Sequence, residues 1–433
     1  MNTSNDLQKQ HSLLQNSTST QRKSSMNKTE IRTPSEVSNL SPSPRLYGRR
    51  SFLRNVGVGA MALAPAAALL SGAGKASARS SRSTLTEGDA AILRFLAAAE
   101  ILESDLWEQY WELGGLAFGE HVDIPRGEAA PHFSGGNAAY TTALLILDGD
   151  MPQYITDNTD DEFSHQAFIR AFLVSKGAST ADIDLLAGPT FRTLPGSMAT
   201  GSSGKRRLTN LTQLTIDTSF GGRYRSDDNN PDLDPAVRFA QSVPSLNNGL
   251  HTAIPRTDAD ANNMDLITAI AFTAGFHFAF IEQGGTSLYP SLAQRVTDPE
   301  VLRILLSIGP TETMHFQTWQ DKAGNANTNP NGPPGNPPFT VHDPINNSTV
   351  TFVDLHFGQP ETLQANLIMP EPCAFLHRTF PNCSIIRPTE TRGAAMGAVR
   401  ALTDDGLFRG QSRAFFDLLD RVAQEADEAQ RED

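Results

Sequence analysis

Apolar side chains recur every three or four residues in four stretches of the chain, the spacing of one face of an α-helix. Thr84 or Thr86 can cap the start of the first stretch, and Gly114 and Gly115 end it. The third stretch is apolar nearly all round, so we expect it at the centre of the fold. The predicted helices cover residues 84–114, 137–149 with a continuation to 177, 265–283 and 299–323.

The segments between and after these helices are less regular. Residues 178–257 are rich in Gly, Ser and Asn and are weakly patterned, which predicts a long insertion. Residues 324–346 form a Pro- and Asn-rich loop, followed by STVTFVDLHF as a possible strand. A last amphipathic helix is predicted at about 410–430. The pattern therefore predicts an all-α protein with long irregular insertions.

The first 78 residues differ in composition from the rest. Residues 1–48 are polar, and we expect them to be disordered. GRRSFLRN, a weakly apolar segment and Ala76-Ser77-Ala78 then follow in the order of a twin-arginine export signal cleaved after Ala78. An uncleaved membrane anchor is the alternative interpretation. The predicted domains are 1–78, a helical domain at 79–325 and a C-terminal extension at 326–433.

The export signal implies a periplasmic or extracellular protein that meets the twin-arginine translocase already folded. No other segment approaches the 18 apolar residues of a membrane span, so we expect no stable membrane insertion. The chain has 35 Lys and Arg against 48 Asp and Glu, which argues against nucleic acid as a partner. In an oxidising compartment its two cysteines, Cys373 and Cys383, could form a structural disulfide.

Two of the predicted helices carry the same polar motif on an apolar face. Glu162 and His165 stand three apart in TDDEFSHQAFI, and Glu312 and His315 repeat that spacing in PTETMHF. In the second case the pair continues the stripe of apolar residues that begins at Val301. The motif therefore places a carboxylate and an imidazole inward on each helix.

The other two helices also bring a carboxylate to the apolar face. These are Glu100 or Glu103 on the first helix and Glu282 on the third. Buried carboxylates cost several kcal/mol each and repel one another unless they are compensated. Two metal ions would compensate them, and a set of carboxylates and imidazoles suits iron or manganese. The alternative is that these residues are surface acids and hydrogen-bonded core histidines.

The order E, E-x-x-H, E, E-x-x-H resembles the ferritin-like superfamily of four-helix proteins with two metal ions, a pattern typical of that superfamily. More narrowly, AAAEILESDLW, DDEFSHQAF, FIEQGGTSLYPSL and SIGPTETMHF resemble exported ferritin-like domain proteins related to desiccation-associated proteins. The resemblance covers about 86–325 and implies a ferritin-like four-helix bundle. It also implies a role for each ligand: Glu162 and Glu312 bridge the metals, and His165 and His315 each bind one.

The resemblance further implies that Glu282 is a terminal ligand, and that Glu100 is preferred to Glu103 because an aromatic residue follows it by seven. Two departures stand out. Trp107 replaces a common tyrosine, and Pro310 lies inside the fourth helix, where it should kink the helix near its ligands. His277 is interpreted as a core histidine or as a residue that supports a ligand.

The implied function is an oxidoreductase with a carboxylate-bridged di-iron or di-manganese centre, acting on dioxygen or peroxide in a ferroxidase-like, peroxidase-like or catalase-like reaction. An alternative is a non-catalytic stress- or desiccation-related envelope protein that uses the helices structurally. A third is an oxygenase whose substrate pocket is formed by residues 178–257. The sequence names neither a substrate nor an oligomeric state.

Overall fold

The computed structural model describes residues 85–117, 135–220, 240–326, 338–353, 355, 372–373, 379–381, 383–384 and 393–432. The chain divides into two units, Met1–Ser80 and Ser81–Asp433, and every described element belongs to the second. The predicted export signal lies outside the described residues and stays a prediction. The described residues are mostly helical, which confirms the all-α class.

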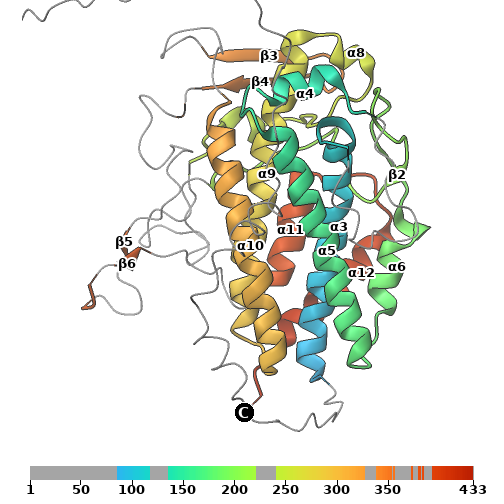
Figure 1. Ribbon diagram of the computed structural model, residues 1–433, viewed down its shortest axis with the longest axis vertical. Helices are drawn as coiled ribbons and strands as arrows, with labels where there is room; N and C mark the ends of the chain where they lie inside the picture. Colours follow the sequence, from blue (N-terminus) through green and yellow to red (C-terminus); the bar gives the residue numbers. More distant parts are fainter. Residues whose placement is uncertain are drawn as a thin grey trace, which may run out of the picture. The chain divides into compact units, whose positions relative to one another are not determined.

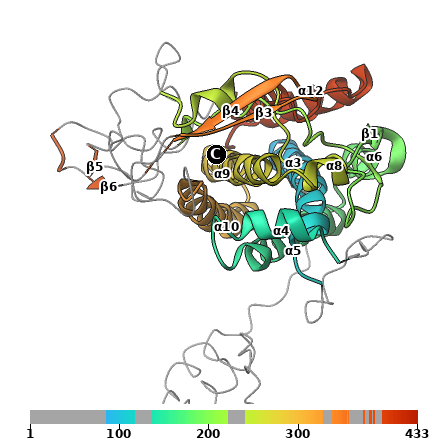
Figure 2. The same cartoon turned by 90° about the horizontal axis from the view of Figure 1, so that it is seen from above.

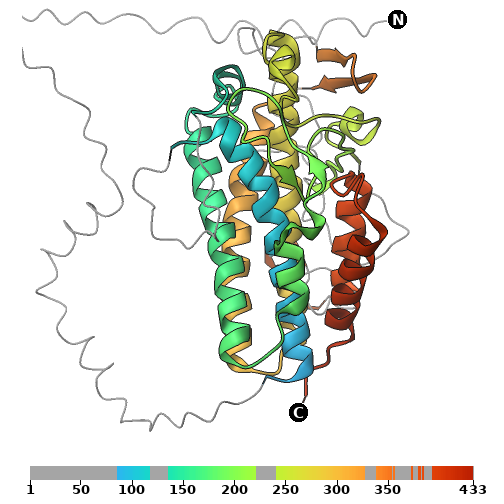
Figure 3. The same ribbon diagram turned by 90° about the vertical axis from the view of Figure 1, so that its right-hand side faces the viewer.

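Four long helices run side by side and enclose the main apolar core (Figure 1, Figure 3). Helix α9 packs along α10, and α3 packs along α5. The short helix α4, Ala138–Leu144, lies against α9 at one end. The four long helices are α3 (Glu87–Gly114), α5 (Met151–Ser175), α9 (Met264–Ala293) and α10 (Pro299–Gly324).

The helix ends follow capping chemistry that is visible in the sequence. Thr86 caps α3, because its hydroxyl accepts a hydrogen bond from the backbone N–H of Asp89 at 3.0 Å. Asp298 caps α10 in the same way, with Pro299 as the first helical residue. Helix α9 is ten residues longer at its C-terminal end than predicted, because it continues through two glycines and Pro290. Helix α10 also continues unbroken through Pro310.

Gly309 explains how α10 approaches α9 so closely. A Cβ atom at this position would lie 2.8 Å from the Cβ of Tyr289, which is closer than side chains normally come. The glycine therefore lets the two backbones pack together just before the Glu312 motif. Larger residues here would push the two helices apart.

The predicted insertion packs on α3 through charged contacts. Arg207 is fully buried and bonds to Glu108 at 2.9 Å and to Glu112 at 2.5 Å. The backbone N–H groups of Leu208 and Thr209 both donate to Asp105. The elements of this segment are α6 (Ala181–Ala187), η2 (Pro189–Phe191), β1 (Leu194–Pro195) paired with β2 (Arg206–Arg207), and η3 (Pro244–Asn247), with α8 (Asp258–Ala261) just after it.

Residues after 326 contribute to the same unit. Strand β4, Ser348–Phe352, is a shorter form of the predicted strand, and it pairs antiparallel with β3, Phe339–Asp343. Helix α11, Ala394–Asp405, was not predicted and packs on α9. Helix α12, Arg413–Glu428, corresponds to the predicted last helix and packs on α3 (Figure 2).

The two cysteines lie in two short strands, β5 (Pro372–Cys373) and β6 (Cys383–Ser384). These strands pair antiparallel with Cys373 opposite Cys383. Their side chains are outside the described part, so the disulfide stays a prediction.

One described helix, α9, is long and apolar enough to cross a membrane by length and composition alone. The prediction that no segment after the export signal has the length and apolar composition of a membrane span is therefore wrong. However, 83% of the most apolar window of α9 is buried inside the protein, as expected of a core helix. This burial agrees with the prediction that the third helix is central.

Candidate metal centre

The structure brings six of the predicted residues together between the four long helices. They form two groups in which each residue offers one ligand atom, all within 4.8 Å of one another. Two glutamates, Glu162 and Glu312, belong to both groups. The first group is Glu100, Glu162, His165 and Glu312, and the second is Glu162, Glu282, Glu312 and His315.

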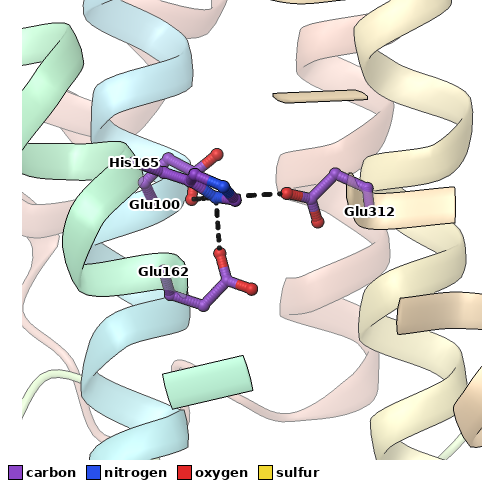
Figure 4. A group of neighbouring side chains, drawn as sticks. All are labelled: Glu100, Glu162, His165 and Glu312. Atoms are coloured by element: carbon purple, nitrogen blue, oxygen red, sulfur yellow. Dashed lines mark hydrogen bonds and ion pairs between the residues drawn. The ribbon is translucent and has the colours of Figure 1, made fainter. Parts of the chain in front are cut away.

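One imidazole nitrogen lies at the centre of the first group (Figure 4). The Nδ1 atom of His165 is 3.2 Å from Glu162 Oε2, 3.3 Å from Glu100 Oε2 and 3.4 Å from Glu312 Oε1. A ring nitrogen carries at most one proton and can donate it well to only one of these oxygens. Three carboxylates that converge on one nitrogen are the arrangement expected around a shared cation.

The second group is built in a similar way around His315. Its Nδ1 atom is 3.2 Å from Glu282 Oε2 and 3.3 Å from Glu162 Oε1. Its other nitrogen, Nε2, lies 3.1 Å from Asp161 Oδ2. A carboxylate on the far nitrogen is the usual way in which a metal-binding histidine is oriented. Asp161 thus holds Nδ1 of His315 toward the glutamates.

Several buried oxygen atoms in the groups have no hydrogen-bond partner among the described residues. They are Oε2 of Glu100 and both carboxylate oxygens of Glu312. A buried carboxylate oxygen without a hydrogen bond is costly, and native proteins rarely leave one. The four glutamates of the two groups are all 0% exposed. Buried carboxylate oxygens that accept no hydrogen bond and lie beside two imidazoles fit hard or intermediate metal ions such as iron or manganese.

The ionisation of the group shows the same need for positive charge. Burial lowers the pKa of His165, but the charge and hydrogen bonding of Glu100 and Glu162 outweigh it and raise the pKa to about 11. Burial raises the pKa of Glu162 to about 7, with help from the charges of Glu282 and Glu100. Burial and the neighbouring glutamates raise the pKa of Glu312 well above its usual range. The cluster therefore retains protons unless another cation replaces them.

Further side chains hold the glutamates and were not predicted. Tyr289 on α9 donates a short hydrogen bond from its hydroxyl to Glu100. Asn158 donates to Glu162 Oε1 at 2.7 Å and to Glu282 Oε1 at 3.0 Å. Asn158 lies one helical turn before Glu162 on the same face of α5, so the apolar stripe contained a signal for it.

Trp107 and His277, which the sequence analysis singled out, both have hydrogen-bond partners in the core. Trp107 donates from its indole N–H to Glu282 Oε1 at 3.0 Å, so this tryptophan, at a position where a tyrosine is common, holds a glutamate of the cluster. His277 is fully buried and belongs to neither metal group. Its Nδ1 lies 2.7 Å from the hydroxyl of Tyr110, and its Nε2 lies 3.1 Å from Asp405. The core interpretation of His277 accounts for both contacts.

Glu103, the alternative ligand on the first helix, belongs to neither group. It is partly exposed and lines a cavity on the other side of α3 and α9. Burial raises the pKa of Glu103 well above its usual range, and the charges of Glu100, Glu162 and Glu282 add to that effect. The geometry thus favours Glu100, which faces His165, as the residue of α3 in the cluster.

No protein-family model, curated protein or solved structure matches this chain. The ferritin-like resemblance therefore rests on the chain alone. Its basis is the order of the glutamates and histidines along four long helices.

Proposed function

We propose that the protein is an exported ferritin-like four-helix bundle whose six clustered residues hold two metal ions, iron or manganese. The observation that carries the proposal is the sharing of Glu162 and Glu312 between both groups, because bridging carboxylates are what two neighbouring ions require. The carboxylate oxygens of Glu312, which accept no hydrogen bond from the described residues, would supply ligand atoms. His165 and His315 would each bind one ion, and Glu100 and Glu282 would be terminal ligands.

Bound iron or manganese would supply redox chemistry with dioxygen or peroxide. The protein's part is to fix the ligands before the metal arrives. Tyr289 and Asn158 position three of the glutamates through hydrogen bonds, and Asp161 orients His315. Trp107 and Trp319 stack with ring centroids 5.3 Å apart beside Glu282 and Asn158, and this aromatic wall excludes water from that side.

A second candidate function is a non-catalytic stress- or desiccation-related envelope protein, in which metal only strengthens the helices. The complete burial of all four glutamates favours it, because a closed site suits a structural ion as well as a reactive one. Both functions predict bound metal, but only the first predicts catalytic turnover.

The proposal is tested on the full chain, folded with Fe(II) or Mn(II) and freed of loose metal. We expect about two ions per chain by elemental analysis, as for other dinuclear sites, and turnover of Fe(II) with dioxygen or of peroxide. Fewer than about one ion per chain, unchanged in Glu312→Ala, would contradict the proposal. Bound metal that raises the melting temperature without turnover would support the structural function instead.

Gly285→Ala should weaken metal binding about 10- to 100-fold, the usual size of an effect on ligand support. A Cβ atom at Gly285 would lie 2.6 Å from Glu312 Oε2 and would displace that carboxylate. Gly284→Ala is the matched control, because a Cβ atom there meets nothing within 4 Å. Competition with a chelator measures both affinities. Equal affinities in the two variants would show that Glu312 does not need its observed position.

A further inference from the structure

A cavity of about 580 Å³ lies beside the candidate metal centre, on the other side of α3 and α9. Its size is that of a pocket for a small organic molecule. Residues of the cavity wall are close in sequence to residues of the candidate centre. Glu103 follows Glu100 by about one turn of α3, and Gln283 and Gly284 directly follow Glu282 on α9. Helix α11 closes the opposite side.

Much of the lining of this cavity is apolar. Phe95, Leu102, Phe280 and Leu288 contribute apolar surface, and all four are buried. Removing an apolar ligand from water into such a pocket is favourable at roughly 25 cal/mol per Å². These apolar side chains therefore suit an aromatic or aliphatic body.

The charged groups on the lining are mostly acidic. Glu103, Asp217, Asp404 and Asp405 line the cavity, with Arg400 as the basic residue. Glu103 makes no hydrogen bond or ion pair with any described residue, and its partly exposed surface adjoins the cavity. A ligand ammonium group that donates to the free oxygens of Glu103 would favour the ionised carboxylate, offsetting the burial and the neighbouring charges that raise the pKa of Glu103. An anionic ligand would meet the acidic side chains of Glu103, Asp217 and Asp404.

We propose that this cavity binds a small amphipathic amine, with its apolar body against α3 and α9 and its ammonium group on Glu103. Glu103 then separates the bound amine from Glu100 by one helical turn. Binding itself requires no metal. The proposal therefore stands independently of the proposed function.

Two ligands with the same ring system and opposite charge test the chemistry of the cavity. They are 2-(1-naphthyl)ethylamine and 1-naphthylacetate, titrated into the full chain by calorimetry. We expect the amine to bind at least about tenfold more tightly than the carboxylate. Glu103→Gln should reduce that preference, because it removes the charge and keeps the side-chain shape. Equal binding of the two ligands, or a preference unchanged in Glu103→Gln, would overturn the proposal.

Two cavity-filling variants test the location from opposite walls. Gly284→Leu on α9 and Gly397→Leu on α11 each place a side chain where a Cβ atom meets nothing within 4 Å, so both should fold. We expect each to weaken amine binding at least about tenfold. Gly149→Leu is the control, since Gly149 also has open space around it and does not line the cavity. Unchanged binding in both cavity variants would overturn the proposal.

Repeating the titration with Glu312→Ala separates the two proposals. Amine binding that persists while bound metal is lost shows that the cavity binds its ligand independently of the centre. Metal binding without any preference for the amine would leave the metal centre standing and remove the cavity site.

Discussion

Replacing Glu162 with alanine should remove both metal ions of the proposed centre, because this carboxylate belongs to both groups. Its two oxygens face different histidines: Oε2 lies 3.2 Å from Nδ1 of His165, and Oε1 lies 3.3 Å from Nδ1 of His315. Without it, each ion loses a ligand and the repulsion between the ions is no longer screened. Elemental analysis of the purified variant should give close to zero ions per chain, against about two for the wild type.

Glu282→Ala is the matched control, since Glu282 is also a fully buried glutamate but belongs to only one group. This variant should keep about one ion per chain. Circular dichroism must show both variants helical, so that loss of metal is not loss of fold. If Glu162→Ala and Glu282→Ala bind the same amount of metal, the carboxylate of Glu162 does not bridge two ions.

The long helices and the six clustered residues could be predicted because both depend on local spacing. Glu162, His165, Glu312 and His315 lie on stripes with helical periodicity, and burial of a stripe brings its polar members inward. Tyr289 lies on the same face of α9, seven residues after Glu282. It was missed because the predicted third helix stopped at residue 283, before two consecutive glycines that usually end helices.

One of those glycines has a tertiary role that no local rule contains. Gly285 stays helical and makes room for Glu312 of the neighbouring helix, at a position where any Cβ atom would collide with the carboxylate. Helix propensity disfavours glycine by about 1 kcal/mol, so the sequence argued for an end where packing requires continuation. Helix α11 was missed for a related reason, because its apolar face is short and follows residues with no clear pattern.

Arg207→Met should destabilise the protein by about 3–5 kcal/mol, the cost of leaving buried carboxylates without their cation. Arg207 is 1% exposed and holds Glu108 and Glu112, which are themselves buried on α3. Methionine fills much of the same space, so the loss is mainly electrostatic. The midpoint of urea denaturation, followed by circular dichroism, measures the change. When it is measured at urea concentrations well below that midpoint, the metal content of the variant should equal that of the wild type, because neither Glu108 nor Glu112 belongs to the metal groups.

Lys205→Met is the control, because Lys205 bonds to the same Glu108 at 3.1 Å while its side chain is 39% exposed. A solvated ion pair contributes about 0–1 kcal/mol, so this variant should differ little from the wild type. Adding Glu108→Gln and Glu112→Gln to Arg207→Met should recover most of the stability, since it removes the stranded charges. If Arg207→Met unfolds no more easily than Lys205→Met, the 178–257 segment is held on α3 by its backbone contacts to Asp105 and not by this buried charge.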